Sequence, residues 1–457
     1  MEGNQPLVPP GLVLGTLAAL VIIVVANNSM GSLAQPDIAT AFGAGPADVG
    51  WVVFGYSVSF AVSTAIWGAI GRRFGIGRAL SVAIVILALA SVAAAVAPSL
   101  TLLVACRVLQ GFGSGAIPTL GNALIGRHYH GPARAAALGV IVGSVGTGLA
   151  IGPLLGGVLL DFAGWRAVVG LGLLTAPTSL LVLRADRQAG DAGGRIDLVG
   201  AALVGSAALA AVFLLNRLPV LGLAPITIVA LAVLALALPA AGWHSLVRGG
   251  TFLPRAVIAE PNYRRLVALG AVGMSAFLGC LVIVPIAVER AQGLAGLELG
   301  LVLLPMALTS AVLSPNNGRV TARLGHGRTA RLSLALLALG PLLLASLGAA
   351  ASPLALSAAL VPLGAGFALL NAPLIDQLMT IFEGPLAPVA VGSYNLLFFL
   401  GGSFGAALST ALLQARLHLP LLPADAAEPG FAAAALLLAA LPALAALLLW
   451  RASTIVR

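Results

Sequence analysis

The chain has 457 residues, of which 60% are hydrophobic and only 8% are charged. Soluble proteins carry about 25% charged residues, so the composition excludes a soluble fold of this size and predicts an all-α membrane protein. The net charge of +9 does not indicate nucleic-acid binding, because the arginines stand singly or in small groups between apolar stretches, without a basic face or an aromatic platform.

Apolar segments long enough to cross a membrane follow one another along the whole chain. Such a helix needs about 20 mostly apolar residues, and the connections between the segments are short and carry Pro, Gly or charge. We expect 14 transmembrane helices, at 12–34, 49–70, 79–97, 101–125, 134–160, 165–183, 196–216, 222–243, 264–288, 297–317, 329–349, 354–379, 386–413 and 430–450.

The seventh and eighth segments stand apart from the others because polar linkers, 184–195 and 244–265, flank them. The expected architecture is therefore two six-helix bundles plus two extra helices. The predicted domains are an N-terminal six-helix bundle at 1–183, a linker with two extra transmembrane helices at 184–263 and a C-terminal six-helix bundle at 264–457.

The distribution of arginine predicts the orientation. With the N-terminus in the cytoplasm, 18 of the 23 arginines fall in inner segments, and Arg107 alone lies within a span. Basic residues collect on the cytoplasmic side of membrane proteins, so we expect a multi-pass protein with both termini cytoplasmic.

The two sets of six segments also share a sequence pattern. The connection 68–78 and the connection 318–328 both place Gly, Arg, Gly and Arg at matching steps. Internal repeats are typical of secondary transporters. We expect Arg72, Arg73 and Arg78 of the first connection to take part in conformational change.

The fifth segment contains an unusual run of helix-weakening residues: Gly148, Gly152, Pro153, Gly156 and Gly157. Glycines spaced by four share one helix face, and such a bare face lets another helix approach closely. We expect this stretch to form a seam that repacks when the halves of the protein move.

Several motifs together resemble those of the major facilitator superfamily, in its 14-helix drug/proton antiporter branch, which includes tetracycline efflux proteins of the Gram-positive type. The stretch 148–157 resembles the antiporter motif of helix 5, and Arg107-Val-Leu-Gln-Gly-Phe-Gly113 resembles the helix 4 motif. Further similar stretches are Leu33–Ala39, Trp51, Asp197–Gly200, Leu304-Pro305 and Asn395–Gly405.

The resemblance implies the major facilitator fold and a secondary exporter that works by alternating access in the bacterial inner membrane. It also implies exchange with protons, but the usual ionisable groups are depleted. The family usually has Asp where this chain has Arg72 and Ala322, and often an acid where it has Asn27 and Asn28. An ion-independent facilitator or a lipid-handling transporter of the same fold therefore stays open as the alternative.

The predicted substrate-binding residues are polar or aromatic positions within spans: Asn27, Asn28, Tyr56, Arg107, Asn371, Tyr394, Asn395 and Phe398. A charge inside a span normally faces a cavity or a partner, and the resemblance links the arginine of the helix 4 motif to proton relay and substrate binding. Purely structural roles, such as an arginine that binds carbonyl groups or amides that join helices, stay open. A cavity lined by Arg107 and amides favours neutral or anionic amphiphiles.

Asp376 is the predicted coupling residue of the second half. Its place near the inner end of its helix favours an ion pair with Arg319 or Arg323, while protonation coupling is the alternative.

We expect no enzymatic activity, no cofactor and no metal. The spans lack a nucleophile–base pair, and Cys106 and Cys280 lie in separate segments. The expected partners are a small-molecule substrate, membrane lipids and, under antiport, protons, with no nucleic acid and with the protein as a monomer.

Overall fold

The computed structural model describes residues 8–186, 188, 190, 197–221, 224–247, 254–294, 297–414, 428 and 430–451. All regular secondary structure in this part of the chain is helical, which confirms the predicted all-α class. Twelve candidate membrane spans, long and apolar enough to cross a bilayer, lie within it. Much of the two predicted polar linkers, including 191–196 and 248–253, lies outside the described residues.

The expected count of 14 spans stays a prediction. The predicted spans 134–160 and 196–216 fall on helices whose side chains are described only in part. One of these helices, α9 (Leu198–Leu221), has 24 residues, which corresponds to about 36 Å at 1.5 Å per residue and is enough to cross a bilayer.

The first group of helices covers the N-terminal part of the chain. Its members are α1 (Pro10–Leu33), α2 (Gln35–Phe42), α3 (Pro46–Phe74), α4 (Ile76–Ala95), α5 (Leu100–Ser114), α6 (Ala116–His128), α7 (Gly131–Gly170), the 3-10 turn η1 (Leu171–Thr175) and α8 (Thr178–Ala185).

Two glycines shape this group. Gly164, with φ 70° and ψ 179°, breaks α7 into two helices. Gly115 separates α5 from α6, at a point where a Cβ would lie 2.6 Å from the carbonyl oxygen of Phe60 on α3.

The second group covers the C-terminal part. It consists of α12 (Pro261–Gln292), α13 (Leu297–Leu313), η2 (Ser314–Asn316), α14 (Asn317–Leu324), α15 (His326–Leu347), α16 (Pro353–Ile381), η3 (Gly384–Leu386), α17 (Ala387–Gln414) and α18 (Phe431–Arg451). Between the groups the chain forms α9, α10 (Pro225–Leu246) and the short α11 (Arg255–Ile258).

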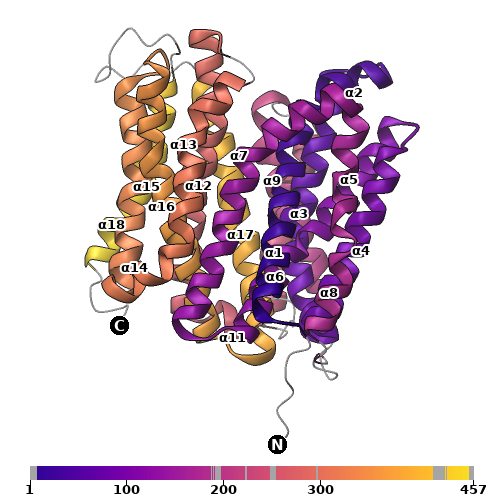
Figure 1. Cartoon of the computed structure of the whole chain (residues 1–457), viewed down its shortest axis with the longest axis vertical. Helices are drawn as coiled ribbons and strands as arrows, with labels where there is room; N and C mark the ends of the chain where they lie inside the picture. Colours follow the sequence, from indigo (N-terminus) through magenta and orange to yellow (C-terminus); the bar gives the residue numbers. More distant parts are fainter. Residues whose placement is uncertain are drawn as a thin grey trace, which may run out of the picture.

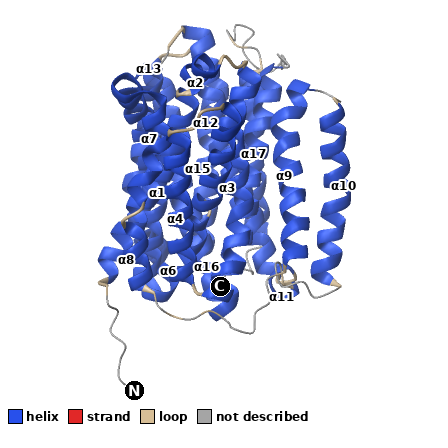
Figure 2. Cartoon of the chain, turned by 90° about the vertical axis from the view of Figure 1, so that its right-hand side faces the viewer, coloured by secondary structure: helices blue, strands red, loops and turns tan. Residues whose placement is uncertain are grey.

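The two groups form adjoining bundles of roughly parallel helices (Figure 1). We call the end at which α1 begins and α18 ends the terminal face. Seen from the side, α9 stands beside α17 and α3, and α10 is the outermost helix (Figure 2). The observed packing agrees with two bundles and an extra helix pair, while the domain boundaries at 183 and 263 stay predictions.

The apolar side chains are distributed as expected for a protein in a bilayer. Large residues such as Trp67, Leu20 and Phe277 are fully buried between helices, whereas Leu236 on α10 is 73% exposed. An exposed face of this kind would be unfavourable in water by about 25 cal/mol for each Å², and in lipid it has no such cost.

Candidate functional site

The two bundles interlock along the half of α7 nearest the terminal face. Gly139, Gly143 and Gly146 lie against α13 and η2 of the other bundle. A Cβ on Gly143 would lie 3.2 Å from the carbonyl oxygen of Ala311, and one on Gly139 would overlap the carbonyl oxygen of Ser314. Only glycine lets the two backbones approach this closely. We call these three residues the inter-bundle glycines.

A second close contact joins α3 to α17, again in the halves nearest the terminal face. A Cβ on Gly68 would lie 2.5 Å from the carbonyl oxygen of Pro388, and one on Gly392 would lie 2.7 Å from that of Thr64. The Thr64 hydroxyl also donates to the Gly392 carbonyl at 3.4 Å. The ribbons of the two bundles meet at the terminal face and diverge toward the opposite face (Figure 1).

The glycines that stood out in the sequence have a different partner. Gly148, Gly152 and Gly156 pack against α1, within their own bundle: a Cβ on Gly148 would lie 2.9 Å from Cβ of Val25, and one on Gly156 2.9 Å from Cγ of Met30. The expected close approach is present, but the partner is not the other half of the protein. A Cβ on Gly157 would meet nothing within 4 Å, and the side chain of Pro153 lies outside the described residues.

The reason is the rotation of a helix along its length. The inter-bundle glycines occupy the half of α7 near the terminal face, and the next glycines follow within one turn. Each residue turns the helix by about 100°, so Gly146 and Gly148 point to different neighbours. The helix therefore has one bare face toward α13 and a second toward α1.

An ion pair joins the bundles at the terminal face. Nε of Arg134, on α7, donates to Oδ1 of Asp376, on α16, at 2.5 Å, and Nη2 donates to the Thr380 hydroxyl at 2.8 Å. His326 Nε2 lies 3.7 Å from the other carboxylate oxygen. The carboxylate of Asp376 is thus shared by the two bundles. The expected partners Arg319 and Arg323 were wrong, since Arg319 instead donates to Asn316 at 3.0 Å.

A cavity of 290 Å³ lies beside this ion pair. Its lining comes from both bundles and includes Arg127, His130 and Arg134 on one side and Met379, Phe382, Glu383 and Pro388 on the other. Contacts between the bundles at the terminal face therefore combine backbone packing, one ion pair and a small polar cavity.

Arg107 is fully buried within the N-terminal bundle. Its Nη1 donates to Oδ1 of Asn27 at 2.7 Å and to Oε1 of Gln110 at 2.9 Å, and its Nε donates to the Val52 carbonyl at 3.1 Å. The guanidinium also lies 4.4 Å above the Tyr56 ring. These partners come from α1, α3 and α5, so in this conformation Arg107 fastens three helices together.

One donor of this arginine has no partner among the described residues. Nη2 of Arg107 is buried without a hydrogen bond and lies 2.9 Å from where a Cβ of Gly31 would be. On the neighbouring turn of α1, the carboxamide oxygen of Asn28 is likewise buried and unpaired. The amide of Asn27 donates to the Val168 carbonyl at 2.9 Å, which ties α1 to the end of α7.

A chain of aromatic rings crosses from one bundle to the other. The rings of Tyr56 and Phe60 on α3 are stacked at 6.3 Å, and Phe60 meets Phe399 on α17 edge-to-face at 4.8 Å. Phe399 contacts Phe398 at 5.3 Å, and Phe398 stacks on Tyr394 at 5.7 Å. Tyr56, Phe398 and Tyr394 are buried, whereas the two rings at the junction keep exposed surface.

Phe60 was missed by the sequence analysis. Its position one helical turn after Tyr56 could have suggested that the two rings share a helix face. Nothing in the sequence, however, shows that α3 and α17 cross there. The predicted Asn371 accepts a hydrogen bond from the Tyr394 hydroxyl at 2.8 Å. Asn395 donates to the Thr119 hydroxyl of the other bundle at 3.2 Å, so it joins the bundles in this conformation.

The three arginines of the first repeat lie near the terminal face, Arg72 and Arg73 in the last turn of α3 and Arg78 in the first turn of α4. Nε of Arg72 is buried without a partner among the described residues, Arg73 stands over the Phe74 ring at 5.5 Å, and Arg78 is exposed. An acid that the sequence analysis missed holds the connection between these two helices: Asp186 accepts from the backbone amide of Gly77 at 3.2 Å.

Within the described residues, no group of three or more His, Cys, Asp or Glu side chains is arranged to hold a metal ion. Cys106 and Cys280 are both free and buried.

The comparisons with known proteins agree with this architecture. A family model described as the Major Facilitator Superfamily matches residues 16–406. The chain belongs to the major facilitator superfamily. It is thus a multi-pass membrane protein of a transporter family, and at the level of the family it is not an enzyme.

Curated members of the superfamily resemble this chain over most of its length. The tetracenomycin C resistance and export protein of Streptomyces glaucescens is 29% identical over 411 residues, which cover 88% of this chain and 75% of that protein. The drug efflux pump JefA of Mycobacterium tuberculosis is 28% identical, with 87% and 79% covered. The multidrug resistance protein Stp of the same species is 27% identical, with 86% and 74% covered.

A solved structure supports the fold. The human organic anion transporter MFSD10 (TETRAN) superposes with a TM-score of 0.66, covering 97% of this chain and all of that one (100%), at 16% sequence identity. At this identity the likeness concerns the fold of the superfamily alone.

Proposed function

We propose that this protein is a secondary exporter of small amphiphilic or hydrophobic compounds across the bacterial cytoplasmic membrane. Three relatives that match most of the chain are a resistance and export protein, a drug efflux pump and a multidrug resistance protein. The observation that carries the mechanism is the asymmetric contact between the bundles, which interlock at the terminal face through backbone packing and the Arg134–Asp376 pair.

The terminal face is the cytoplasmic face in this proposal, because the predicted inner segments hold most of the arginines. The conformation then corresponds to the stage in which the cytoplasmic side is closed. Transport requires a second conformation in which the inter-bundle glycines separate from α13. A substrate enters from the cytoplasm in that conformation and leaves on the other side in this one.

Substrate contacts belong, in this proposal, to the aromatic chain between the bundles. Phe60 and Phe399 lie at the junction and keep exposed surface, and the neighbouring Tyr394 is hydrogen-bonded to Asn371. Arg107 and Asn27 lie behind these rings, because both side chains are buried inside the N-terminal bundle and hydrogen-bonded to its helices. Neutral or anionic amphiphiles fit a region that has aromatic rings, amides and a nearby buried arginine.

Proton-linked antiport is the proposed drive, and the carboxylate of Asp376 is the proposed proton-binding group. When the cytoplasmic side opens, Arg134 must leave this carboxylate, and a proton bound by Asp376 then offsets the lost positive charge. The alternative is ion-independent facilitation. This alternative is supported by the scarcity of acids: among the described acids, Asp376 alone is buried within a spanning helix, and it lies at the membrane edge.

Purified protein in proteoliposomes distinguishes these functions. Efflux of a fluorescent neutral or anionic amphiphile is followed with and without an imposed pH gradient. Antiport predicts that an inward proton gradient drives accumulation against the concentration gradient. Equal substrate concentrations on both sides, whatever the gradient, identify a facilitator. Absence of any protein-dependent flux contradicts the proposed function.

We propose that the working unit is a monomer.

A further inference from the structure

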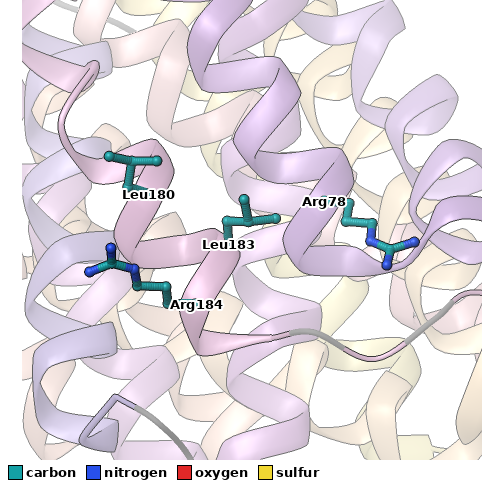
Figure 3. Close-up of a pocket in the computed structure, with 4 residues that line it drawn as sticks. All are labelled: Arg78, Leu180, Leu183 and Arg184. Carbon is teal, nitrogen blue, oxygen red and sulfur yellow. The ribbon is translucent and has the colours of Figure 1, made fainter.

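A second cavity lies on the outer surface of the N-terminal bundle, away from the contact between the bundles. It has a volume of 340 Å³ and lies where α4 begins and α8 ends, near the terminal face. Its lining consists of Arg78 from α4 with Leu180, Leu183 and Arg184 from α8 (Figure 3). None of these residues takes part in the proposed transport path.

The two walls of this cavity are fixed relative to each other. Oδ2 of Asp186, directly after α8, accepts from Nη1 of Arg127 at 2.7 Å and from the Gly77 amide at the start of α4 at 3.2 Å. One turn further in, the Ser81 hydroxyl donates to the Ser179 carbonyl at 2.7 Å. The cavity is therefore a preformed feature of the folded bundle, not a gap between mobile segments.

The lining combines apolar surface with positive charge. Leu180 is 60% exposed and Leu183 is 38% exposed. Both Arg78 and Arg184 are exposed, and in the part of the chain that the structure describes neither forms an ion pair with an acid. Arg78 and Arg184 lie to either side of Leu183 in the close-up view (Figure 3).

This combination, at the end of the membrane-spanning helices, matches the chemistry of a lipid at the membrane edge. Exposed leucines on a spanning helix contact acyl chains, and arginines at its end lie at the level of the phosphate groups. Basic pockets between transmembrane helices on the cytoplasmic side bind anionic headgroups. A soluble anion would use the arginines but would leave the leucines without a partner.

We propose that this cavity binds an anionic phospholipid, with an acyl chain along Leu180 and Leu183 and a headgroup phosphate that Arg78 and Arg184 contact by turning their side chains toward it. The bound lipid then braces the start of α4 against α8, directly after the last turn of α3, which carries Arg72 and Arg73. The ligand class is set by charge and amphiphilic shape. Binding does not depend on the protein being an exporter.

The test is lipid binding measured by native mass spectrometry on purified detergent-solubilised protein, with phosphatidylglycerol titrated against phosphatidylcholine. The wild type should retain phosphatidylglycerol preferentially. An arginine near anionic lipid contributes about 1 kcal/mol, or about fivefold in affinity. Arg184→Gln should therefore weaken binding about fivefold, and Arg78→Gln with Arg184→Gln about 25-fold. The preference should also decline at high salt.

The matched control is Arg264→Gln with Arg265→Gln, which removes two exposed arginines at the start of α12. This control should keep the preference for phosphatidylglycerol. If the double variant at positions 78 and 184 binds phosphatidylglycerol as tightly as the control does, the proposal is overturned. It is also overturned if inorganic phosphate competes with the lipid at similar concentration, since the leucines would then contribute nothing. If the double variant does not fold, two single variants replace it: Arg184→Gln, and Leu180→Glu, which places a negative charge in the cavity. Both should bind phosphatidylglycerol more weakly than the control, and unchanged binding in both overturns the proposal.

Discussion

At the scale of single residues, Arg107 of the helix 4 motif lies, in this conformation, inside the N-terminal bundle. A lone charge in a span suggested a residue facing the substrate, yet its side chain is fully buried and donates to Asn27, Gln110 and the Val52 carbonyl. A buried guanidinium without a carboxylate partner is stable only if neutral acceptors surround it. The amides of Asn27 and Gln110 and the Val52 carbonyl supply those acceptors.

We predict that Arg107→Ala destabilises the N-terminal bundle. Three acceptors would lose their donor, each at about 1 kcal/mol or more, so the free energy of unfolding should fall by about 3 kcal/mol. Thermal unfolding in detergent, followed by tryptophan fluorescence, checks this. A variant that is as stable as wild type but inactive in transport would show that Arg107 acts on substrate or protons instead.

Gly31→Ala tests the same network without removing the charge. Its Cβ would lie 2.9 Å from Nη2 of Arg107, so the guanidinium must shift away from its acceptors. We expect a loss of about 1–2 kcal/mol, visible as a lower unfolding temperature. Gly157→Ala is the control on α7, because its Cβ would meet nothing within 4 Å. Equal stability of the two variants would argue against a rigid network around Arg107.

At the scale of helices, α7 is the element on which the proposed mechanism depends. Its inter-bundle glycines face α13, and Gly148, Gly152 and Gly156 face α1. The sequence showed that α7 has bare backbone, because glycine spacing reports a shared face directly. It did not show which helix covers that face, since the partner depends on how helices cross in three dimensions. For the same reason Tyr394 and Phe398 were predictable from the sequence, whereas Phe60 and the partner of Asp376 were not.

We predict that Gly139→Val and Gly152→Val fail in different ways. The first places a side chain against the Ser314 carbonyl of the other bundle, so it should hinder closure of the cytoplasmic side while leaving the N-terminal bundle folded. The second places one against the Ser29 hydroxyl inside the bundle, so it should lower thermal stability. Reactivity of a cysteine introduced at Ser310 with a cytoplasmic thiol reagent should rise for Gly139→Val and stay low for Gly152→Val. The opposite order would contradict the assignment of the two faces.

At the scale of the whole molecule, the fold class and the superfamily were predictable from composition, apolar segment lengths and motif order. The arrangement of the two bundles was not predictable, because the same sequence must support at least two such arrangements. The contacts that define this arrangement are the inter-bundle glycines, the pairing of α3 with α17 and the Arg134–Asp376 ion pair. Each joins residues that are far apart in sequence.

We predict that Asp376→Asn shifts the equilibrium toward opening of the cytoplasmic side. A hydrogen bond to a charged group contributes about 1.5–3 kcal/mol, so the ratio of closed to open protein should fall by about tenfold or more. The distance between labels on α7 and α14, measured by pulsed electron paramagnetic resonance, checks this. The control is Glu383→Gln, which removes an exposed acid near the same cavity. An unchanged distance distribution in Asp376→Asn would show that the Arg134–Asp376 ion pair does not keep the cytoplasmic side closed.

If export requires the bundles to separate at the cytoplasmic side, a reversible cross-link between them should block it. A Cβ on Gly318 would lie 3.3 Å from Cβ of Ala135 in the other bundle, close to the spacing of about 3.8 Å found in disulfides. In a protein without Cys106 and Cys280, Ala135→Cys with Gly318→Cys should form a disulfide on oxidation. We predict that transport then stops and that reduction restores it. Undiminished transport by the fully cross-linked protein would show that the bundles need not separate at this face.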